Sequence, residues 1–364
     1  MKVFYYLRRN PRGRQQDTIR SAPAIIEAIS PKFDYVEGKT VVSRGNIITH
    51  LLPYFPFALN LKALPKHINV DAVYLFCGLL KHNLPYVSEI DNPSCLTYYS
   101  PLSISNPLIV RIIKYFTSKS NFLSFLPLSN AARKGMLKLL DYDFEDKINV
   151  LYPPFLYDVE KKETELPSFI FISYHFLAKG GREIIKAVKQ LKGKFKFTMV
   201  TTLPTKLNLP KQITIRNRVS RYELIHEILP LHDVVVHPTY MDSFGMAPYE
   251  GINVGLAGIS TDMYALPEFV IHEKNGFNFP SPIEYFNKDY LPNLRFWSKT
   301  KIEHYVKTHQ FPNVVKSLVE YMQYYIDNPK ELKKHQKMSK HLAKTKFSLK
   351  ERNKRLLKIL ERGK

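Results

Sequence analysis

Short apolar runs alternate with segments of helical spacing along most of the chain. Runs rich in β-branched and aromatic residues predict strands at residues 2–7, 71–78, 85–90, 122–129 and 147–154. Helical patterns are predicted at residues 18–29, 108–116 and 131–140. Strands that alternate with helices in this way indicate a parallel sheet covered by helices.

A second cycle of the same pattern follows an interruption. Pro153-Pro154 and the charged segment 158–167 break the alternation, and we expect a linker there. Strands are then predicted at residues 168–174, 195–201, 212–218 and 233–239, and helices near 181–191 and 221–228. The 364 residues therefore predict two similar α/β lobes, 1–155 and 156–340. Residues 281–309 are aromatic-rich and irregular, and fit neither cycle.

The charge of the chain is strongly positive. Lys and Arg number 54 against 32 Asp and Glu, a formal net charge of +22, which favours polyanionic partners: nucleic acid, anionic lipid headgroups or phosphate-bearing ligands. Much of this charge lies in residues 330–364, whose helical spacing fits either a solvated helix face or a membrane-surface helix.

Cysteine content and hydropathy indicate the cellular compartment of the protein. Cys77 and Cys95 are too few for a disulfide framework and lack metal-binding spacing, which fits a reducing cytosol. The first apolar run is too short for a signal peptide, and no later stretch approaches ~20 uncharged apolar residues. We therefore expect a cytoplasmic protein, with a peripheral position on the cytoplasmic face of the membrane as an option.

One segment combines a strand, a turn and two acids. The strand at 233–239 runs into a helical pattern opened by Gly245, with Asp242 before it and Glu250 eight positions after Asp242. The dipole of that helix N-terminus attracts a phosphate or a sugar oxygen, through the N–H groups of Phe244, Gly245 and Met246. Ionised carboxylates accept hydrogen bonds from the paired hydroxyls of a ribose or hexose. The alternative is that Asp242 caps the helix and Glu250 pairs with a lysine.

The order of these residues resembles glycosyltransferase family 4, whose members are retaining enzymes of the GT-B fold. In that family a strand ending in Pro-Ser leads to Glu-x-Phe-Gly, a second Glu eight residues after the first, a strand ending in Thr-Asp and a Gly-Phe pair. This chain carries, in the same order, Pro238-Thr239, Asp242-Ser243-Phe244-Gly245, Glu250, Gly255-Leu256-Ala257, Thr261-Asp262, Pro267-Glu268 and Asn275-Gly276-Phe277. Lys179-Gly180 matches a family Lys-Gly upstream, and the resemblance covers about residues 147–276.

The resemblance implies two Rossmann-like lobes whose parallel sheets face each other across a cleft, with residues 341–364 forming a helix that packs back on the first lobe. It implies that Glu250 holds the donor ribose, Asp242 the transferred sugar and Lys179 the diphosphate. Asp242 and Lys179 would be the catalytic pair, and Ser243 would join the helix start in binding the donor. Gly13 matches a family glycine that lets backbone approach the diphosphate, and a plain turn glycine is the alternative.

The expected chemistry follows from the leaving group. Departure of a nucleoside diphosphate leaves negative charge on phosphate oxygens, which Lys179 and the helix N-terminus would stabilise. No acidic pair or His cluster of metal-binding type is visible in the sequence, so we predict a metal-independent enzyme without a cofactor.

The chain departs from the family at several positions. The family's arginine before Lys-Gly falls near Tyr174-His175, so His175 or Arg182 is the expected replacement cation. A first-lobe histidine of many relatives is absent. Asp91, in that region, is a candidate contact for the sugar, with a turn or cap as the alternative. His237 is expected to be a buried, hydrogen-bonded residue outside the site.

These observations predict a hexosyltransferase-type enzyme that moves a sugar, with retention, from a nucleoside-diphosphate donor to a glycan, lipid-linked or other hydroxyl acceptor. An anionic membrane surface is a further expected partner. The alternatives are a non-catalytic nucleotide-sugar-binding protein, because the family arginine is missing, and a basic nucleic-acid-binding protein, because of the charge. No nucleic-acid-binding motif is visible, so we expect no specific nucleic acid as partner.

Overall fold

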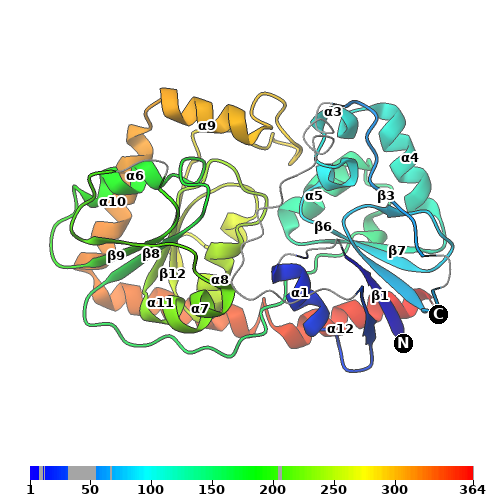
Figure 1. Cartoon of the computed structure of the whole chain (residues 1–364), viewed down its shortest axis with the longest axis horizontal. Coiled ribbons are helices and arrows are strands. Elements are labelled where there is room, and N and C mark those ends of the chain that lie inside the picture. The colour runs from blue at the N-terminus through cyan, green and yellow to red at the C-terminus, as the bar shows by residue number, and fades with distance from the viewer. Residues whose placement is uncertain (8–10, 12, 32–54, 66–67, 204–206, 364) are drawn as a thin grey trace.

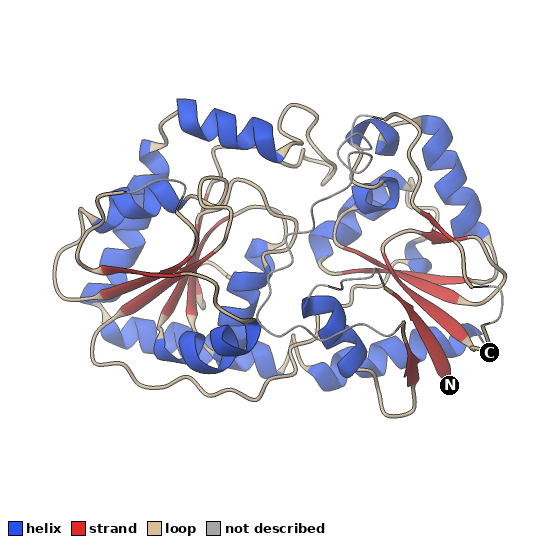
Figure 2. Cartoon of the chain, viewed as in Figure 1, coloured by secondary structure: helices blue, strands red, loops and turns tan. Residues whose placement is uncertain are grey.

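Two lobes, each built on a parallel sheet, make up the protein (Figures 1 and 2). The computed structural model describes residues 1–7, 11, 13–31, 55–65, 68–203 and 207–363. The first lobe has a five-stranded sheet of order β2-β1-β4-β6-β7, and the second a six-stranded sheet of order β10-β9-β8-β11-β12-β13. Every pairing in both sheets is parallel. The two-sheet architecture predicted from the alternation is confirmed.

The first lobe contains the elements up to α5. Its strands are β1 (Lys2–Tyr6), β2 (Glu27–Ile29), β3 (Leu61–Lys62), β4 (Ala72–Phe76), β5 (Leu79–Leu80), β6 (Tyr86–Ile90) and β7 (Phe122–Pro127). Its helices are α1 (Gly13–Arg20), α3 (Pro101–Ile104), α4 (Pro107–Ser118) and α5 (Asn130–Leu139). The strands β4, β6 and β7 are almost wholly buried, because helices or chain segments cover both faces of the sheet.

The second lobe follows an extended connection. Its strands are β8 (Ser168–Ile172), β9 (Lys196–Val200), β10 (Ile213–Arg216), β11 (Val234–His237), β12 (Ala257–Thr261) and β13 (Gly276–Phe279). Its helices are α6 (Gly181–Val188), α7 (Arg221–Glu223), α8 (Met246–Val254), α9 (Lys299–Thr308), α10 (Pro312–Asp327) and α11 (Pro329–Lys344).

Two predicted elements of the first lobe are wrong. The predicted helix at 18–29 is instead the end of α1, a turn and the edge strand β2, because Pro23 cannot continue a helix. The predicted strand at 147–154 is not a strand. Its chain is extended and bonds to β7 through the N–H groups of Asn149 and Leu151, and Pro153-Pro154 offer no donors to continue the ladder.

Two C-terminal helices expose basic side chains and bury leucines. Leu332 and Leu342 of α11 are buried in the cores of the second lobe and the interlobe region. The last helix, α12 (Leu349–Leu360), buries Leu356 and Leu360 against the first sheet, beside Tyr5 of β1. The exposed faces of both helices are therefore polar.

A cluster of aromatic rings joins the lobes, and we call it the interlobe ring cluster. It consists of Tyr152, Phe244, Tyr249, Phe269 and Phe347. Phe347 makes edge contacts with Tyr152 of the first lobe and Tyr249 of the second, at centroid distances of 5.1 and 5.2 Å. The Tyr249 hydroxyl also donates to the Pro153 carbonyl (2.8 Å). The lobes therefore share a common apolar core.

The aromatic segment 281–309 also reaches across the lobes. Trp297 stacks on Tyr285 at 4.5 Å between centroids, and Phe286 stacks on Tyr264 at 3.8 Å. The Trp297 indole N–H donates to the Tyr99 carbonyl of the first lobe (2.8 Å). This packing accounts for the aromatic content that fitted neither cycle.

In the part of the chain that the structure describes, no helix combines the length and apolarity needed to cross a bilayer.

Candidate active site

The predicted turn lies between β11 and α8. Gly245 precedes α8 with φ 86° and ψ 65°, a left-handed conformation that favours glycine. A Cβ there would lie 2.5 Å from Leu266 Cδ2, so both the backbone conformation and the close contact disfavour a side chain at this position. Because Gly245 has none, Leu266 can pack directly against the start of α8, and Asp242 lies in the turn before it.

Asp242 is the centre of a hydrogen-bond network. Its Oδ1 accepts from the N–H groups of Phe244 (3.4 Å) and Gly245 (3.0 Å), and its Oδ2 accepts from Lys179 Nζ (2.6 Å) and His237 Nε2 (2.9 Å). The bonds to Phe244 and Gly245 close the turn before α8. They do not cap the helix, because Gly245 is its N-cap and no side chain bonds to its first turn, so the alternative role of Asp242 as a cap is wrong. Asp242 forms an ion pair with Lys179. Burial favours the neutral acid, but Lys179 and then His237 outweigh it and hold the pKa of Asp242 well below its usual range.

Lys179 reaches Asp242 because two glycine-dependent turns meet. Gly180, at φ 76°, precedes α6, and a Cβ on it would lie 2.3 Å from the Pro238 carbonyl oxygen. This close approach brings the end of the β8–α6 loop against the β11–α8 loop. The Lys179 ammonium donates to the Met241 carbonyl and to Asp242, which leaves one of its three N–H bonds for a further acceptor.

His237 belongs to the network although the sequence interpretation excluded it. It is buried and hydrogen-bonded, as predicted, but its partner is Asp242. Burial lowers the pKa of His237, so the neutral ring donates from Nε2. Its Nδ1 is buried and accepts no hydrogen bond from the described residues.

The residues at the start of α8 divide into two groups. The Phe244 ring packs in the interlobe ring cluster, against Tyr249 and Phe269, so it faces the core. The N–H groups of Phe244 and Gly245 are already used by Asp242. Met246, the first residue of α8, and Ser243 in the turn are partly exposed.

Glu250 lies one turn further along α8 and is 3% exposed. Its Oε1 accepts from Arg221 Nη1. Arg221 Nη2 also donates to Asp17 of α1 in the first lobe, at 2.6 Å, and Asp17 is 2% exposed. The Tyr157 hydroxyl completes the group by donating to Asp17 (2.9 Å). One guanidinium therefore links buried carboxylates from both lobes.

The charges in this group depend on one another. Burial raises the pKa of Glu250, and Arg221 opposes that shift. The pKa of Arg221 is raised above its ordinary value because Glu250 and Asp17 outweigh the effect of burial. Arg221 therefore favours the ionised form of Glu250, against the effect of burial.

Asp91 follows β6 and faces the second lobe. Its Oδ1 accepts from the N–H of Asn92 (2.9 Å), as the predicted turn requires, and its Oδ2 accepts from the Tyr99 hydroxyl (3.0 Å). Ser243 Oγ donates to the same Oδ2 across the lobes, at 3.3 Å. Asp91 thus lies beside the turn that holds Asp242.

The remaining predicted site residues differ in whether they lie near Asp242. His175 is exposed, and its carbonyl accepts from the N–H of Lys179 (3.0 Å). Arg182 donates to Glu183 (2.8 Å) and to the His309 carbonyl (2.8 Å), away from Asp242. Gly13 begins α1, and a Cβ on it would lie 2.7 Å from Arg221 Cδ. The structure thus brings His175 to the site, engages Arg182 elsewhere, and places Gly13 against Arg221.

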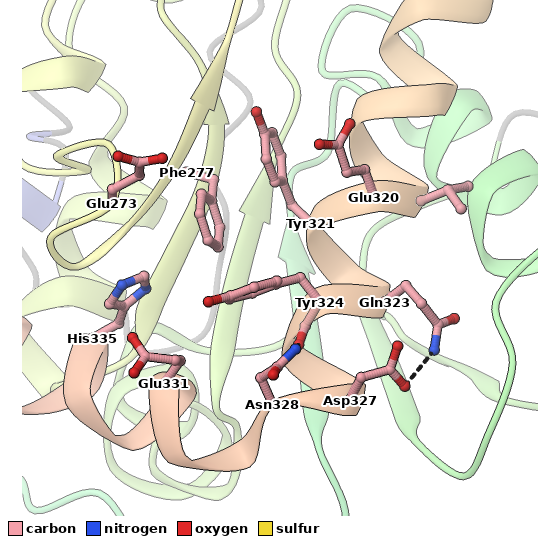
Figure 3. Close-up of a pocket in the computed structure, with 11 residues that line it drawn as sticks. Glu273, Phe277, Glu320, Tyr321, Gln323, Tyr324, Asp327, Asn328, Glu331 and His335 are labelled. Carbon is pink, nitrogen blue, oxygen red and sulfur yellow. Dashed lines mark hydrogen bonds between the residues drawn. The ribbon is translucent and has the colours of Figure 1, made fainter.

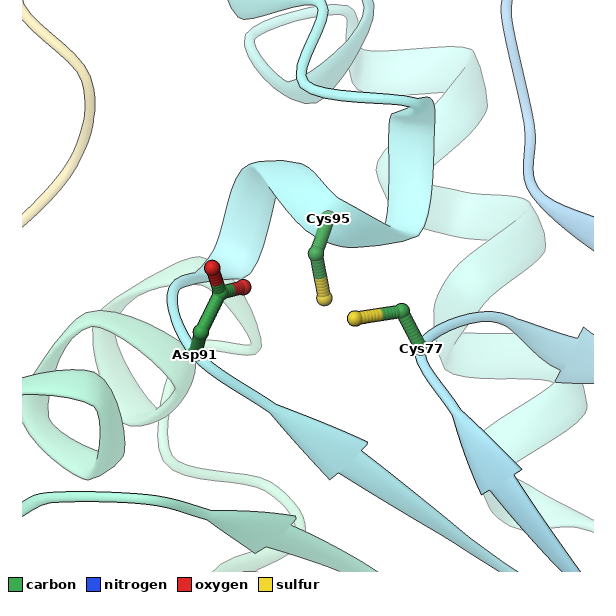
Figure 4. A group of neighbouring side chains, drawn as sticks. All are labelled: Cys77, Asp91 and Cys95. Carbon is green, nitrogen blue, oxygen red and sulfur yellow. The ribbon is translucent and has the colours of Figure 1, made fainter. Parts of the chain in front are cut away.

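The two cysteines meet in space although their sequence spacing gave no sign of it. Cys77 follows β4 and Cys95 lies in the 3₁₀ helix after β6, with Asp91 between them in the chain. One potential ligand atom from each of the three residues lies within 4.8 Å of the others (Figure 4). Cys95 is fully buried, and burial raises the pKa of its thiol.

Cavities open elsewhere on the second lobe. One of about 640 Å³ lies between β13, α10 and α11, and carboxylates and aromatic rings line it (Figure 3). Another of about 810 Å³ lies between α6 and α10. No predicted site residue lines either of them.

Sequence reasoning missed the charged residues that link the lobes. Besides Arg221 and Asp17, Arg14 of α1 pairs with the buried Glu89 of β6. Glu268 of the second lobe accepts from the N–H groups of Asn130 and Ala131 at the start of α5, each at 2.8 Å. The resemblance includes Glu268 without a role in linking the lobes. A cue was also available for α1, since Arg14 and Asp17 follow the first strand, at the edge where ligands of parallel sheets bind.

Comparison with known proteins places this geometry in context. The family model described as "Glycosyl transferases group 1" matches residues 156–289, which include all six strands of the second lobe's sheet. No curated protein matches the chain's sequence.

Solved glycosyltransferase structures share the architecture of the whole chain. HepE of Anabaena, in complex with UDP and glucose, superposes with a TM-score of 0.59 at 11% identity, over 99% of both chains. A glycosyltransferase from Rickettsia africae gives 0.63 at 14% identity, over 100% of this chain and 98% of that one. Sucrose-phosphate synthase of Thermosynechococcus elongatus gives 0.64 at 10% identity, over 99% and 98%. The predicted GT-B fold is confirmed.

Proposed function

We propose that this chain is a metal-independent, retaining glycosyltransferase that moves a hexose from a nucleoside-diphosphate donor to a hydroxyl acceptor on a glycan or lipid-linked molecule. The observation that carries the proposal is the ion pair of Lys179 with Asp242 at the start of α8, with Glu250 on the same helix. The family model over residues 156–289 supports glycosyl transfer in general. Retention and the finer family rest on the resemblance in sequence.

Each part of the donor has a matching group. The ribose diol would bind Glu250 through Oε2, since Arg221 donates to Oε1. The third N–H of Lys179 would meet a diphosphate oxygen, and the N-terminus of α8 would add its positive dipole. Asp242, fixed by Lys179 and His237, would orient the hydroxyls of the sugar together with Asp91. Arg221 is the cation nearest Glu250, and we propose it in place of Arg182 as the compensation for the missing family arginine.

The proposed reaction exchanges one bond for another at the anomeric carbon. The bond from that carbon to the diphosphate oxygen breaks, and a bond to the acceptor oxygen forms on the same face. The proton of the acceptor hydroxyl passes to the departing diphosphate. Lys179 stabilises the charge that develops on the leaving group, which lowers the barrier because that charge is greatest in the transition state.

The first test is donor binding. Full-length protein is heated with UDP-, GDP-, ADP- and dTDP-sugars, with and without EDTA, because a bound ligand raises the melting temperature. UDP-glucose is the first donor to try, since HepE, which shares the fold, binds it. We expect one nucleotide class to raise the melting temperature equally with and without EDTA. No shift with any donor, combined with salt-dependent binding to RNA or DNA, would overturn the proposal.

Two variants separate binding from turnover. Glu250→Ala is expected to weaken donor binding by about 10- to 100-fold, because a charged hydrogen-bond acceptor is lost. Lys179→Ala is expected to lower donor hydrolysis by about 10²- to 10³-fold while donor binding changes less. Lys189→Ala, at an exposed position after α6, is the matched control. Unchanged affinity and hydrolysis in both variants would contradict the assigned roles.

A further inference from the structure

The first lobe exposes an apolar surface that the core does not use. Helix α4 has apolar residues on two faces. Ile109 and Ile113 are buried in the first lobe, whereas Leu108, Ile112 and Tyr115 recur at the spacing of one outer face. These three outer side chains are 62%, 40% and 60% exposed. An isolated exposed leucine is common, but a whole helix face of apolar side chains indicates an interaction site.

Neighbouring residues extend this surface. Phe55 and Phe57 are each 54% exposed, and Leu102 of α3 is 42% exposed. They belong to the same surface because Ser103 Oγ donates to the Phe55 carbonyl (2.6 Å) and Asn106 Nδ2 to the Pro56 carbonyl (3.1 Å). These bonds hold the 55–57 segment against α3 and the start of α4. We call Phe55, Phe57, Leu102, Leu108, Ile112 and Tyr115 the α4 surface.

Helix α4 carries no acidic residue. Its basic residues are Arg111 and Lys114, and Lys119 follows its last residue. Lys114 pairs with Asp141 and Asp143, at 2.8 and 2.7 Å. Arg111 and Lys119 make no ion pair with any described residue, and Lys119 Nζ lies 4.6 Å from the centroid of the Tyr115 ring. Apolar side chains with flanking basic groups are the combination that enters the interface of an anionic bilayer.

We propose that the α4 surface docks the protein on anionic lipid membranes. The inference rests on this exposed face and goes beyond the proposed glycosyl transfer. Helix α4 lies on the outer side of the first lobe, remote from the second sheet, so a bilayer can approach it without contacting the second lobe (Figure 1). A second copy of the chain is disfavoured as the occupant, because each copy carries a net charge of +22.

The C-terminal helices carry more charge but lack an apolar outer face. The inner faces of α11 and α12 are buried in the protein, and none of their large apolar side chains is exposed beside the exposed lysines. The structure therefore favours the solvated-face interpretation for residues 330–364. It moves the predicted membrane contact from the C-terminus to α4.

The test is co-sedimentation of the full-length protein with vesicles of phosphatidylcholine and with vesicles of equal parts phosphatidylcholine and phosphatidylglycerol. We expect binding to the mixed vesicles that weakens with added salt, and little binding to phosphatidylcholine alone. The variant Leu108→Gln/Ile112→Gln/Tyr115→Gln should bind the mixed vesicles at least about tenfold more weakly. Because the three side chains are exposed, its melting temperature should match that of the wild type.

Control variants test whether the α4 surface is the part of the protein that contacts the membrane. Leu231→Gln/Leu294→Gln removes two leucines of the second lobe that are 50% and 53% exposed, and should leave binding unchanged. Arg111→Gln/Lys119→Gln should weaken binding and reduce its salt dependence, whereas Lys333→Gln/Lys337→Gln on α11 should not.

Two outcomes would overturn the proposal. The first is vesicle binding that survives the α4 triple variant or is lost with the α11 variant. The second is a dimer in sedimentation velocity that the triple variant dissociates, which would make a second copy the partner. Neither vesicle binding nor sedimentation velocity requires a sugar donor, so both measurements are independent of the proposed glycosyl transfer.

Discussion

Replacing Arg221 by glutamine tests the charge balance between the lobes. The substitution leaves two buried carboxylates, Asp17 and Glu250, without their shared cation. Removing one partner of a buried ion pair costs about 3–5 kcal/mol. The Arg221 side chain is 28% exposed, so water screens part of this interaction, and we expect a loss of about 2–3 kcal/mol at neutral pH. In a lobe of this size that loss lowers the melting temperature by roughly 5–10 °C.

The loss should depend on pH in a defined direction. Burial already raises the pKa of Glu250, with Arg221 opposing the shift, so the pKa rises further in Arg221→Gln. A carboxyl group whose pKa is raised by folding binds its proton more tightly in the folded state. Its contribution to stability is therefore most favourable at low pH and falls as the pH rises through the raised pKa. The deficit of Arg221→Gln relative to the wild type should be smaller at about pH 5 than at about pH 8.

The assay is thermal melting of matched variants at both pH values. Arg221→Lys keeps the charge and should recover part of the stability, and Arg216→Gln, at an exposed arginine, should change little. Adding Glu250→Gln to Arg221→Gln removes one unpaired carboxylate and should restore stability at the higher pH. Equal deficits at both pH values, or a deficit no larger than that of Arg216→Gln, would refute the reasoning.

Further substitutions test the turn and the network around Asp242. Gly245→Ala should destabilise the protein by about 2–4 kcal/mol, because the strain of the left-handed backbone adds to the clash with Leu266. Gly255→Ala, at φ 104° in open surroundings, should cost only the strain of the left-handed backbone, and melting temperatures of the two variants test the difference. Asp242→Asn should lower the free energy of unfolding by about 2 kcal/mol or more above pH 5, since the lowered pKa of Asp242 contributes stability there. Urea titrations should show this loss shrinking as the pH falls below about 4, and a loss that does not change with pH would contradict the ion-pair role. Glu268→Ala should lower stability by about 1–3 kcal/mol, because the start of α5 loses its acceptor, and an unaffected urea midpoint would show that this contact is dispensable.

The strands and most helices could be predicted because burial on both faces leaves continuous apolar runs. The limits of β4, β6 and β7 were predicted to within one or two residues. Short edge elements were missed. Strand β2 has three residues, of which Glu27 and Ala28 are exposed and Ile29 is half-buried, and its place in the sheet depends on pairing with β1. The sequence pattern contains no information on that pairing.

The part of the candidate site that comes from one short segment could be predicted from the sequence. The parts that join segments far apart in the sequence could not. Asp242, Gly245 and Glu250 lie within nine residues, and a helix N-terminus fixes their spacing. Arg221 and Asp17 are 204 positions apart, and Cys77 and Cys95 meet only because β4 and β6 are neighbours in the sheet. Such contacts depend on how the lobes and strands pack, which hydrophobic periodicity does not encode.

The interlobe ring cluster limits how the lobes can move relative to each other. Pulling them straight apart would place rings such as Tyr152 and Phe347 in water, at about 1.5–3 kcal/mol each. A twist of one lobe that keeps the rings in contact would instead break charged links between the lobes, such as the bonds of Glu268 and the ion pair of Arg221 with Asp17, at about 1.5–3 kcal/mol each. The rings therefore oppose separation of the lobes, and the charged links oppose their rotation.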